Sequence, residues 1–303
     1  MSGAAAVFAP GSTALITGGA SGVGLAVAKL CHAKGMNLLL VDRNAEALDR
    51  ARLSLAGGEH TAAGGGGGGG VDDASSGPPR VVTSVADVSL PEDWAKIKDS
   101  AIDQFSSVEL LVLNAGVGGK GTWGDHDYFR RILETNLFGV INGVNSLLPV
   151  VQDAAKANKR TAIVITGSKQ GITNPPGNPA YNASKAAVKT LAEHLSWDLR
   201  ETTTSVHLLV PGWTFTGMTG GGQTKDKPAG AWAPEQVADY LYRNMERDEF
   251  YVICPDNDVS EETDKRRMLW SVGDVVNGRP PLTRWRDEWK QQAEKTMSET
   301  RIE

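Results

Sequence analysis

A tyrosine and a lysine four residues apart, Tyr181 and Lys185, follow Ser168 and a proline-rich stretch in the segment SKQGITNPPGNPAYNASK (168–185). If the tyrosine and lysine lie on a helix they share one face, because positions i and i+4 are neighbours there. That arrangement would hold a phenol beside an ammonium. The same pair would also suit a half-buried helix face without chemical function, and this segment alone does not decide between the two.

The rest of the chain predicts the elements that would position these residues. Short apolar runs alternate with helical patterns, which predicts a parallel sheet covered by helices on both faces, a Rossmann-like doubly wound α/β fold. Ser89 is expected to cap one helix, with Pro91 in its first turn and Glu92 three residues after the cap. The expected strands are 13–17, 37–42, 81–86, 110–114, 161–166, 205–210 and 250–255, and the expected helices include 22–35, 44–56, 126–149 and 180–199.

The predicted organisation is a single catalytic domain over residues 11–255 followed by a helical C-terminal extension over 256–303. Within the domain, residues 57–79 contain seven consecutive glycines (64–70) and are expected to form a flexible insertion on the surface. A phosphate-binding loop needs glycines at fixed positions between a strand and a helix, and this run specifies none.

A second glycine cluster has that placement, because the strand TALIT (13–17) leads directly into GGASGVG and a helix. Gly18, Gly22 and Gly24 would allow a tight turn, with the helix N-terminus facing a pyrophosphate. The spacing T-G-x-x-x-G-x-G differs from the common G-x-G-x-x-G pattern, and a plain turn is the alternative. Asp42 ends the second strand, where a carboxylate accepts hydrogen bonds from an adenosine ribose.

In order and spacing, residues 11–255 resemble the short-chain dehydrogenase/reductase family. The matching motifs are TGGASGVG (17–24), ADV (86–88), NAG (114–116), TN (135–136), GS (167–168), YNASK (181–185) and PG (211–212). The sequence departs from the family pattern after the last motif, since Trp213 and Thr214 stand where aliphatic residues are common.

The resemblance implies a catalytic tetrad of Asn136, Ser168, Tyr181 and Lys185. Together with the glycine loop it also implies a cofactor site. That site comprises Gly18, Ser21, Gly22, Val23, Gly24, Asp42, Arg43, Asp87, Val88, Asn114, Ala115, Gly116, Tyr181, Lys185, Pro211, Gly212, Thr214 and Thr216. Lys169 is expected to be a solvated charge, with contact to an acidic substrate as the alternative. Residues 216–230, between Trp213 and Trp232, are a candidate mobile lid.

Hydride transfer to a ketone leaves an alkoxide that needs a proton, and the reverse reaction needs a base. Tyr181 would serve both if its pKa falls from about 10 toward neutrality. Lys185 and the start of the helix would favour the phenolate. Ser168 would hydrogen-bond the substrate oxygen, and Asn136 would hold a water that links Lys185 to solvent.

The implied function is an NAD(P)-dependent oxidoreductase that interconverts a secondary alcohol and a ketone. Two alternatives remain open: a nucleotide-binding sensor or scaffold without turnover, and a lyase or epimerase on the same fold. Asp42 favours NAD over NADP, because a 2′-phosphate would lie beside its carboxylate. Arg43 leaves NADP possible, because a guanidinium is well suited to bind that phosphate.

Composition excludes several classes of partner. A net charge of −5 over 303 residues gives no strong attraction to nucleic acid or an anionic membrane. The five histidines show no metal-ligand spacing, and Cys31 and Cys254 are expected to be buried reduced thiols. The N-terminus lacks the features of a signal peptide, so a cytoplasmic protein is expected. The helices 126–149 and 180–199 resemble the family's dimer interfaces, which implies a homodimer or homotetramer.

Overall fold

The computed structural model describes residues 3–56, 78–220 and 226–302, so the predicted insertion at 57–79 lies outside the described residues except for its last two positions. Seven parallel strands form one sheet in the order β3-β2-β1-β4-β5-β6-β7, as predicted for a doubly wound fold. The strands are β1 (Thr13–Thr17), β2 (Asn37–Asp42), β3 (Val81–Val85), β4 (Leu110–Leu113), β5 (Thr161–Thr166), β6 (Thr204–Val210) and β7 (Tyr251–Ile253).

The strands β1, β4 and β5 are buried along their whole length. Strands covered on both faces read as continuous apolar runs without alternation, which explains sequences such as LLVL in β4. The chain order reverses between β1 and β4, where Ala14 pairs with Leu110 while β2 lies on the other side of β1. Such a reversal opens a crevice at the carboxyl ends of the strands.

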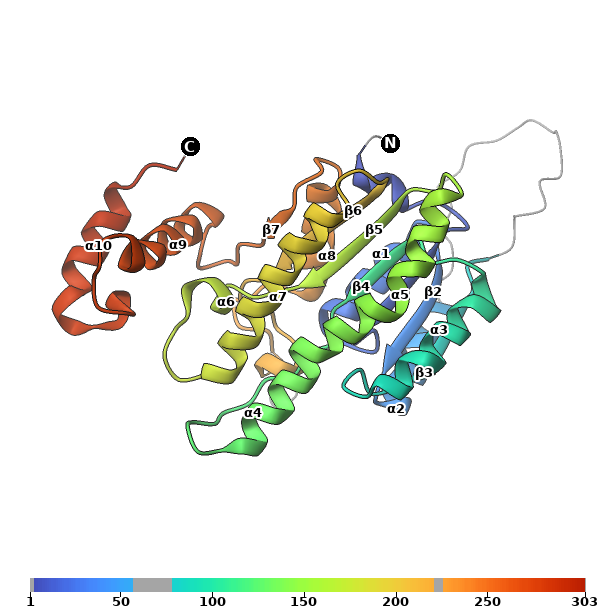
Figure 1. Ribbon diagram of the computed structural model, residues 1–303, viewed down its shortest axis with the longest axis horizontal. Helices are drawn as coiled ribbons and strands as arrows, with labels where there is room; N and C mark the ends of the chain where they lie inside the picture. The colour runs from blue at the N-terminus through green and yellow to red at the C-terminus, as the bar shows by residue number, and fades with distance from the viewer. Residues whose placement is uncertain (1–2, 57–77, 221–225, 303) are drawn as a thin grey trace.

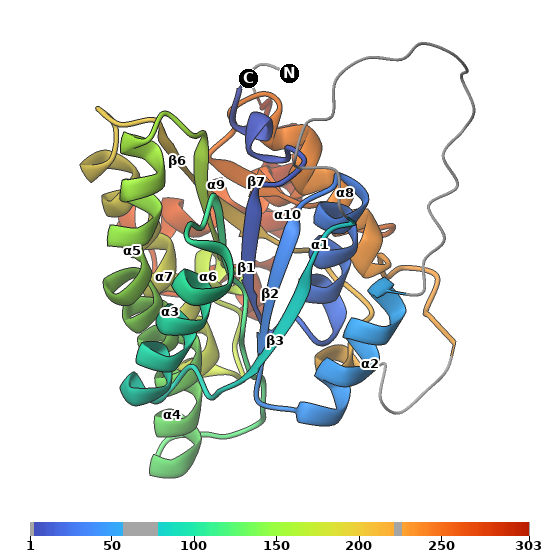
Figure 2. The same ribbon diagram turned by 90° about the vertical axis from the view of Figure 1, so that its right-hand side faces the viewer.

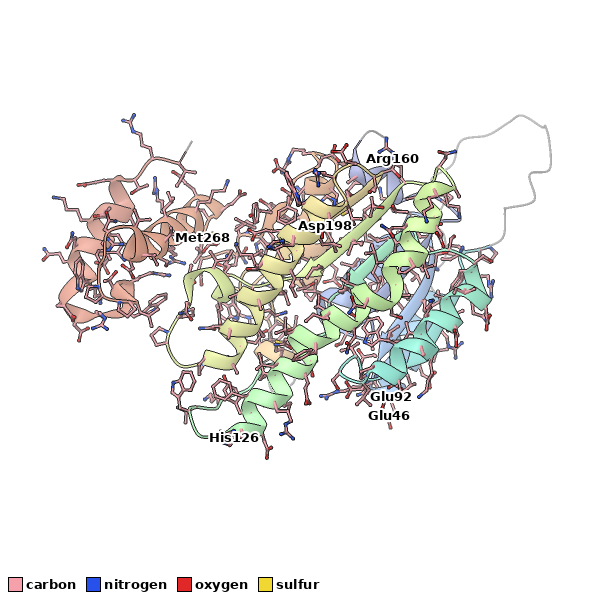
Figure 3. The ribbon with its side chains drawn as sticks, viewed as in Figure 1. Glu46, Glu92, His126, Arg160, Asp198 and Met268 are labelled. Atoms are coloured by element: carbon pink, nitrogen blue, oxygen red, sulfur yellow. The ribbon has the colours of Figure 1, made fainter. Side chains whose placement is uncertain are left out.

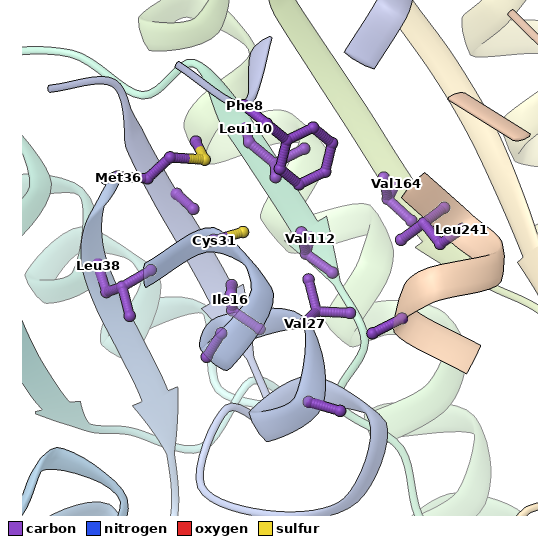
Figure 4. Close-up of a cluster of buried hydrophobic side chains, with 14 of the residues drawn as sticks. Phe8, Ile16, Val27, Cys31, Met36, Leu38, Leu110, Val112, Val164 and Leu241 are labelled. Carbon is purple, nitrogen blue, oxygen red and sulfur yellow. The ribbon is translucent and has the colours of Figure 1, made fainter. Parts of the chain in front are cut away.

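Helices cover both faces of the sheet (Figure 1, Figure 2). One face carries α1 (Gly22–Ala33), α2 (Ala45–Ala56) and α8 (Pro234–Met245), and the other carries α3 (Pro91–Phe105), α5 (Gly139–Lys156) and α7 (Pro179–Asp198). Each layer buries its own apolar cluster. Phe8, Ile16, Val27 and Leu241 belong to the first cluster (Figure 4), and Trp94 belongs to the second.

The predicted cap of α3 is wrong. The helix begins at Pro91 with Leu90 in the capping position, and Ser89 lies outside it. The Asp87 carboxylate accepts hydrogen bonds from both the amide (2.9 Å) and the hydroxyl (2.7 Å) of Ser89, so that hydroxyl is held by a local turn. Pro91 has no amide hydrogen to satisfy, which lowers the need for a cap.

The long helix after β4 extends beyond its predicted end at 149. It comprises α4 (His126–Leu133), a π-helical turn (Glu134–Phe138) and α5, which continues through Pro149 to Lys156. The π turn contains Asn136 and interrupts the regular α-helix there. The other predicted boundaries match the structure or differ from it by at most two residues, and Cys31 and Cys254 are buried free thiols as expected.

After β7 the chain leaves the sheet and forms α9 (Glu261–Val276) and α10 (Lys290–Glu299). These helices lie to one side of the α/β body, beyond the short helix α6 (Gln170–Thr173) (Figure 1), and Figure 3 marks Met268 on α9. No helix in the described part of the chain is long and apolar enough to cross a membrane.

Candidate active site

A cavity of about 830 Å³ opens at the carboxyl ends of the strands, where the strand order reverses. All of the predicted site residues line this cavity except Gly24 and Asn136. The tertiary structure therefore gathers residues from Gly18 to Thr216 around one space. Pockets in this position of a doubly wound sheet commonly bind ligands.

The glycine loop forms one end of the cavity. Gly18 has a φ of +64°, a backbone conformation that residues with a side chain rarely adopt. A Cβ on Gly24 would overlap the carbonyl oxygen of Gly18, so Gly24 lets α1 pack against the loop from behind the cavity. Among the described residues no side chain caps the first turn of α1, whose amide groups are then available to an anion.

Asp42 is held in one orientation at the end of β2. One carboxylate oxygen accepts from the amide of Ala20 (3.3 Å) in the glycine loop, and the other accepts from the amide of Asn44 (3.1 Å). Arg43 is exposed and lines the same cavity. This end therefore presents a fixed carboxylate beside a cation that extends into solvent.

Asn114 lines the cavity after β4 and forms hydrogen bonds to the ends of the two neighbouring strands. Its backbone amide donates to the Thr17 hydroxyl (3.0 Å), and its side-chain amide donates to the Thr17 carbonyl (3.2 Å). Its side-chain oxygen accepts from the Thr166 hydroxyl (3.2 Å). The ends of β1, β4 and β5 are tied together at this one residue.

Asn136 is fully buried and lies behind the cavity wall. Its side chain accepts from the amide of Val117 (2.8 Å) and donates to the Val117 carbonyl (3.0 Å), which pins the loop after β4 to the π turn. A Cβ on Gly116 would stand 3.3 Å from Asn136 Oδ1 and 3.7 Å from Lys185 Nζ. Both side chains therefore lie against the bare backbone of Gly116.

Lys185 and Tyr181 lie on α7, one turn apart, as predicted. Burial lowers the pKa of Lys185 to about 8, and its ammonium donates to the Thr166 carbonyl (2.8 Å). Burial raises the pKa of Tyr181, while a hydrogen bond with Ser168 opposes that rise. The pKa of Tyr181 is therefore raised in the protein without cofactor, because burial outweighs the hydrogen bond with Ser168. A fall in this pKa was expected from the sequence.

A short backbone pairing flanks the predicted lid segment 216–230. The amide of Phe215 donates to the Trp232 carbonyl (2.9 Å), and the amide of Trp232 donates to the Trp213 carbonyl (2.8 Å). These two hydrogen bonds bring the ends of the segment together. Thr214 is buried, and its hydroxyl donates to the Gly212 carbonyl (3.1 Å). Residues 221–225 of the predicted lid lie outside the described part of the chain.

Some lining residues were not predicted. Thr166 ends a predicted strand and Thr135 precedes Asn136, so their positions in the sequence were available signals. Arg131 lies on α4 and Met218 lies in the turn Gly217–Thr219. No local sequence pattern indicates that either residue lines the cavity. Lys169 also lines the cavity, but the expectation that it is solvated is wrong, since it pairs with Asp256 (3.5 Å) and Asp264.

The sequence matches the family model described as short chain dehydrogenase over residues 12–63 and 72–227. It is 30% identical over 214 residues to the mouse protein named dehydrogenase/reductase SDR family member 7B, a match that covers 70% of this chain and 60% of the relative. The chain thus spans about 60% of the length of this relative. It is 28% identical to 1-deoxy-11-beta-hydroxypentalenate dehydrogenase of Streptomyces exfoliatus, over 79% of this chain and 81% of that protein.

Among solved structures, the chain is similar to a short-chain dehydrogenase/reductase from Burkholderia phymatum in complex with NAD. The TM-score is 0.74 with 26% identity, and the match covers 90% of this chain and 97% of that one. The similarity therefore extends over most of both chains.

Proposed function

Because this chain belongs to the short-chain dehydrogenase/reductase family, an NAD(P)-dependent oxidoreductase family, we propose that it interconverts a secondary alcohol and a ketone. The observation that carries the proposal is the continuity of the 830 Å³ cavity, which reaches from Asp42 to Ser168 and Tyr181. A nucleotide bound at one end would thus share a single space with a proton donor at the other.

The residues present fit a nicotinamide dinucleotide. The uncapped first turn of α1 suits a pyrophosphate. Gly24 has no side chain, so α1 can begin directly behind the glycine loop. Asp42 would accept from the adenosine ribose, and Asp87 and Val88 would border the adenine. We propose NAD as the preferred cofactor, because amide donors from Ala20 and Asn44 hold the Asp42 carboxylate in place.

When bound, the cofactor accepts or supplies the hydride. Tyr181 Oη would donate a proton to the substrate oxygen in ketone reduction and remove it in alcohol oxidation. Ser168 Oγ would donate a hydrogen bond to the same oxygen as its charge develops. The Lys185 ammonium would favour the phenolate through its charge, and Asn136 would keep the Gly116 backbone against that ammonium.

The substrate end of the cavity favours a partly apolar substrate. Val117 and Tyr181 pack against the same small apolar cluster, and Met218 lies over Gly118, where an added Cβ would stand 3.2 Å from it. Trp213 adds an aromatic wall. Lys169 carries the positive charge closest in sequence to Ser168, and two carboxylates already neutralise it.

The test is a screen of secondary alcohols and ketones with NAD and NADP, followed by the absorbance of the reduced nicotinamide. We expect turnover with at least one apolar substrate and its loss in Tyr181→Phe. Cofactor binding without turnover on any substrate would favour the sensor alternative. Absence of cofactor binding would overturn the proposal.

A further inference from the structure

A buried charge cluster joins the C-terminal extension to the active-site cavity. Lys169, next to Ser168, forms an ion pair with Asp264 of α9 and lies 3.5 Å from Asp256. The side chains are 15%, 3% and 7% exposed for Lys169, Asp264 and Asp256, respectively. Arg267, one turn further along α9, lies 3.6 Å from the other oxygen of Asp264.

Asp256 connects the same cluster to the loop after β6. One of its carboxylate oxygens accepts from the amide of Trp213 (3.0 Å), and the other accepts from the amides of Asp258 (3.1 Å) and Val259 (2.9 Å). A Cβ on Gly212 would stand 2.8 Å from Lys169 Nζ and 2.9 Å from the Asp256 carboxylate. Residues 168–170 and 211–213 line the cavity from different loops, and both loops therefore contact Asp256.

Stability alone explains this cluster poorly. Removing charges from water is costly, and replacement of buried ion pairs by apolar side chains is often neutral or stabilising. Burial raises the pKa of Asp264, and the lysine opposes that rise.

The cluster holds a segment that lies between two proposed catalytic residues. The Ser168 carbonyl accepts from the amide of Gly171 (3.0 Å) and the Lys169 carbonyl accepts from the amide of Thr173 (2.9 Å), which forms the single turn of α6. A Cβ on Gly171 would stand 2.5 Å from the carbonyl carbon of Lys185, so α6 packs directly on the catalytic turn of α7. A shift of Lys169 would move Ser168 relative to this turn.

We propose that Asp264 and Asp256 are positioning residues for Ser168, and that the C-terminal extension thereby forms part of the active site. The inference rests on the proposed oxidoreductase function. The two carboxylates hold the Lys169 ammonium, Lys169 fixes the start of α6, and Ser168 is kept at hydrogen-bonding distance from the substrate oxygen. Lys169 lines the cavity and Asp264 does not, so Asp264 would act on Ser168 through Lys169.

The main experiment compares Asp264→Asn with Glu262→Gln. The two substitutions remove one negative charge each from the same helix, but Glu262 is 56% exposed and pairs only with Arg266 in the described residues. For Asp264→Asn we expect kcat for ketone reduction to fall about 10- to 100-fold, as small misplacements of catalytic groups do, with the dissociation constant for NAD unchanged. Glu262→Gln is expected to match the wild type in both.

Two further measurements separate positioning from general destabilisation. Amide exchange in residues 170–173 should become faster in Asp264→Asn, while exchange in the central strands stays unchanged. Asp264→Glu, which keeps the charge, should recover part of kcat. The double variant Lys169→Met/Asp264→Asn should lose no more activity than the worse single variant, because both changes break the same contact.

The inference would be overturned if Asp264→Asn keeps wild-type kcat and wild-type exchange in residues 170–173. It would also be overturned if exchange rises equally throughout the protein, since that marks general unfolding. The exchange measurement needs no substrate. A wild type without turnover would thus overturn the proposed function. Amide exchange would still decide whether Asp264 holds residues 170–173 in place.

Discussion

The ammonium of Lys185 lies 5.9 Å from the centre of the Tyr181 ring and donates its hydrogen bond to the Thr166 carbonyl at 2.8 Å. The two side chains share a helix face, yet the lysine is anchored to the strand that leads to Ser168. In the proposed mechanism the lysine would therefore act on the phenol through its charge rather than through a direct hydrogen bond. This geometry separates the expected effects of changing each residue.

Replacing Tyr181 by phenylalanine should abolish turnover and leave NAD binding intact. The ring still packs against the apolar cluster that contains Tyr128 and Ala180, while the proton donor is lost. Steady-state kinetics and cofactor titration by tryptophan fluorescence measure the two effects. Lys185→Met is the companion variant, and it should weaken both, because the ammonium lies against the Gly116 backbone in the cofactor cavity. A near-normal kcat in Tyr181→Phe would remove the proton-transfer role.

Lys185 should make the stability of the cofactor-free protein depend on alkaline pH. Burial lowers its pKa from 10.5 to about 8, so between these values the unfolded chain binds more protons than the folded one. Stability from this group therefore rises as pH increases from about 8 to 10.5, and the cost of burying the charge is fully present below 8. Denaturant unfolding across this range measures the slope, which Lys185→Met should reduce.

Wild-type enzyme should prefer NAD over NADP in kcat/KM. A 2′-phosphate adds about −1.5 to −2 charges beside the Asp42 carboxylate, whose orientation is held by the amides of Ala20 and Asn44. Asp42→Ala should move the preference toward NADP, because exposed Arg43 then faces the phosphate without a competing carboxylate. A wild type that already prefers NADP would assign recognition of this end to Arg43.

We expect the chain to form homodimers or homotetramers through α5 and α7. Trp197 on α7 is 64% exposed, and Phe138, the last residue of the π turn before α5, is 48% exposed, which leaves large apolar side chains uncovered in the single chain. Trp197→Glu should shift the mass measured by light scattering toward the monomer. Leu53→Glu on α2, where the leucine is 61% exposed, is the matched control and should leave the mass unchanged. A monomeric wild type would refute this expectation.

Local patterns predicted most of the fold, since strand β5 has the predicted bounds and the sheet has the predicted parallel arrangement. The errors fall where one side chain has competing partners. Ser89 has the residue type of a helix cap, but its hydroxyl bonds to Asp87 instead. Proline usually ends a helix, yet the helix continues through Pro149.

The sequence by itself determined which residues could do the chemistry, because Tyr181 and Lys185 are four apart on one helix and the glycine loop lies between a strand and a helix. Only the tertiary structure decided what surrounds them. Lys169 reads as a solvated charge in its own segment, but Asp256 and Asp264 lie about ninety residues away and neutralise it. The pKa values of Tyr181 and Lys185 are likewise set by burial. Burial and ion pairing depend on which distant segments pack together, and no local spacing encodes that.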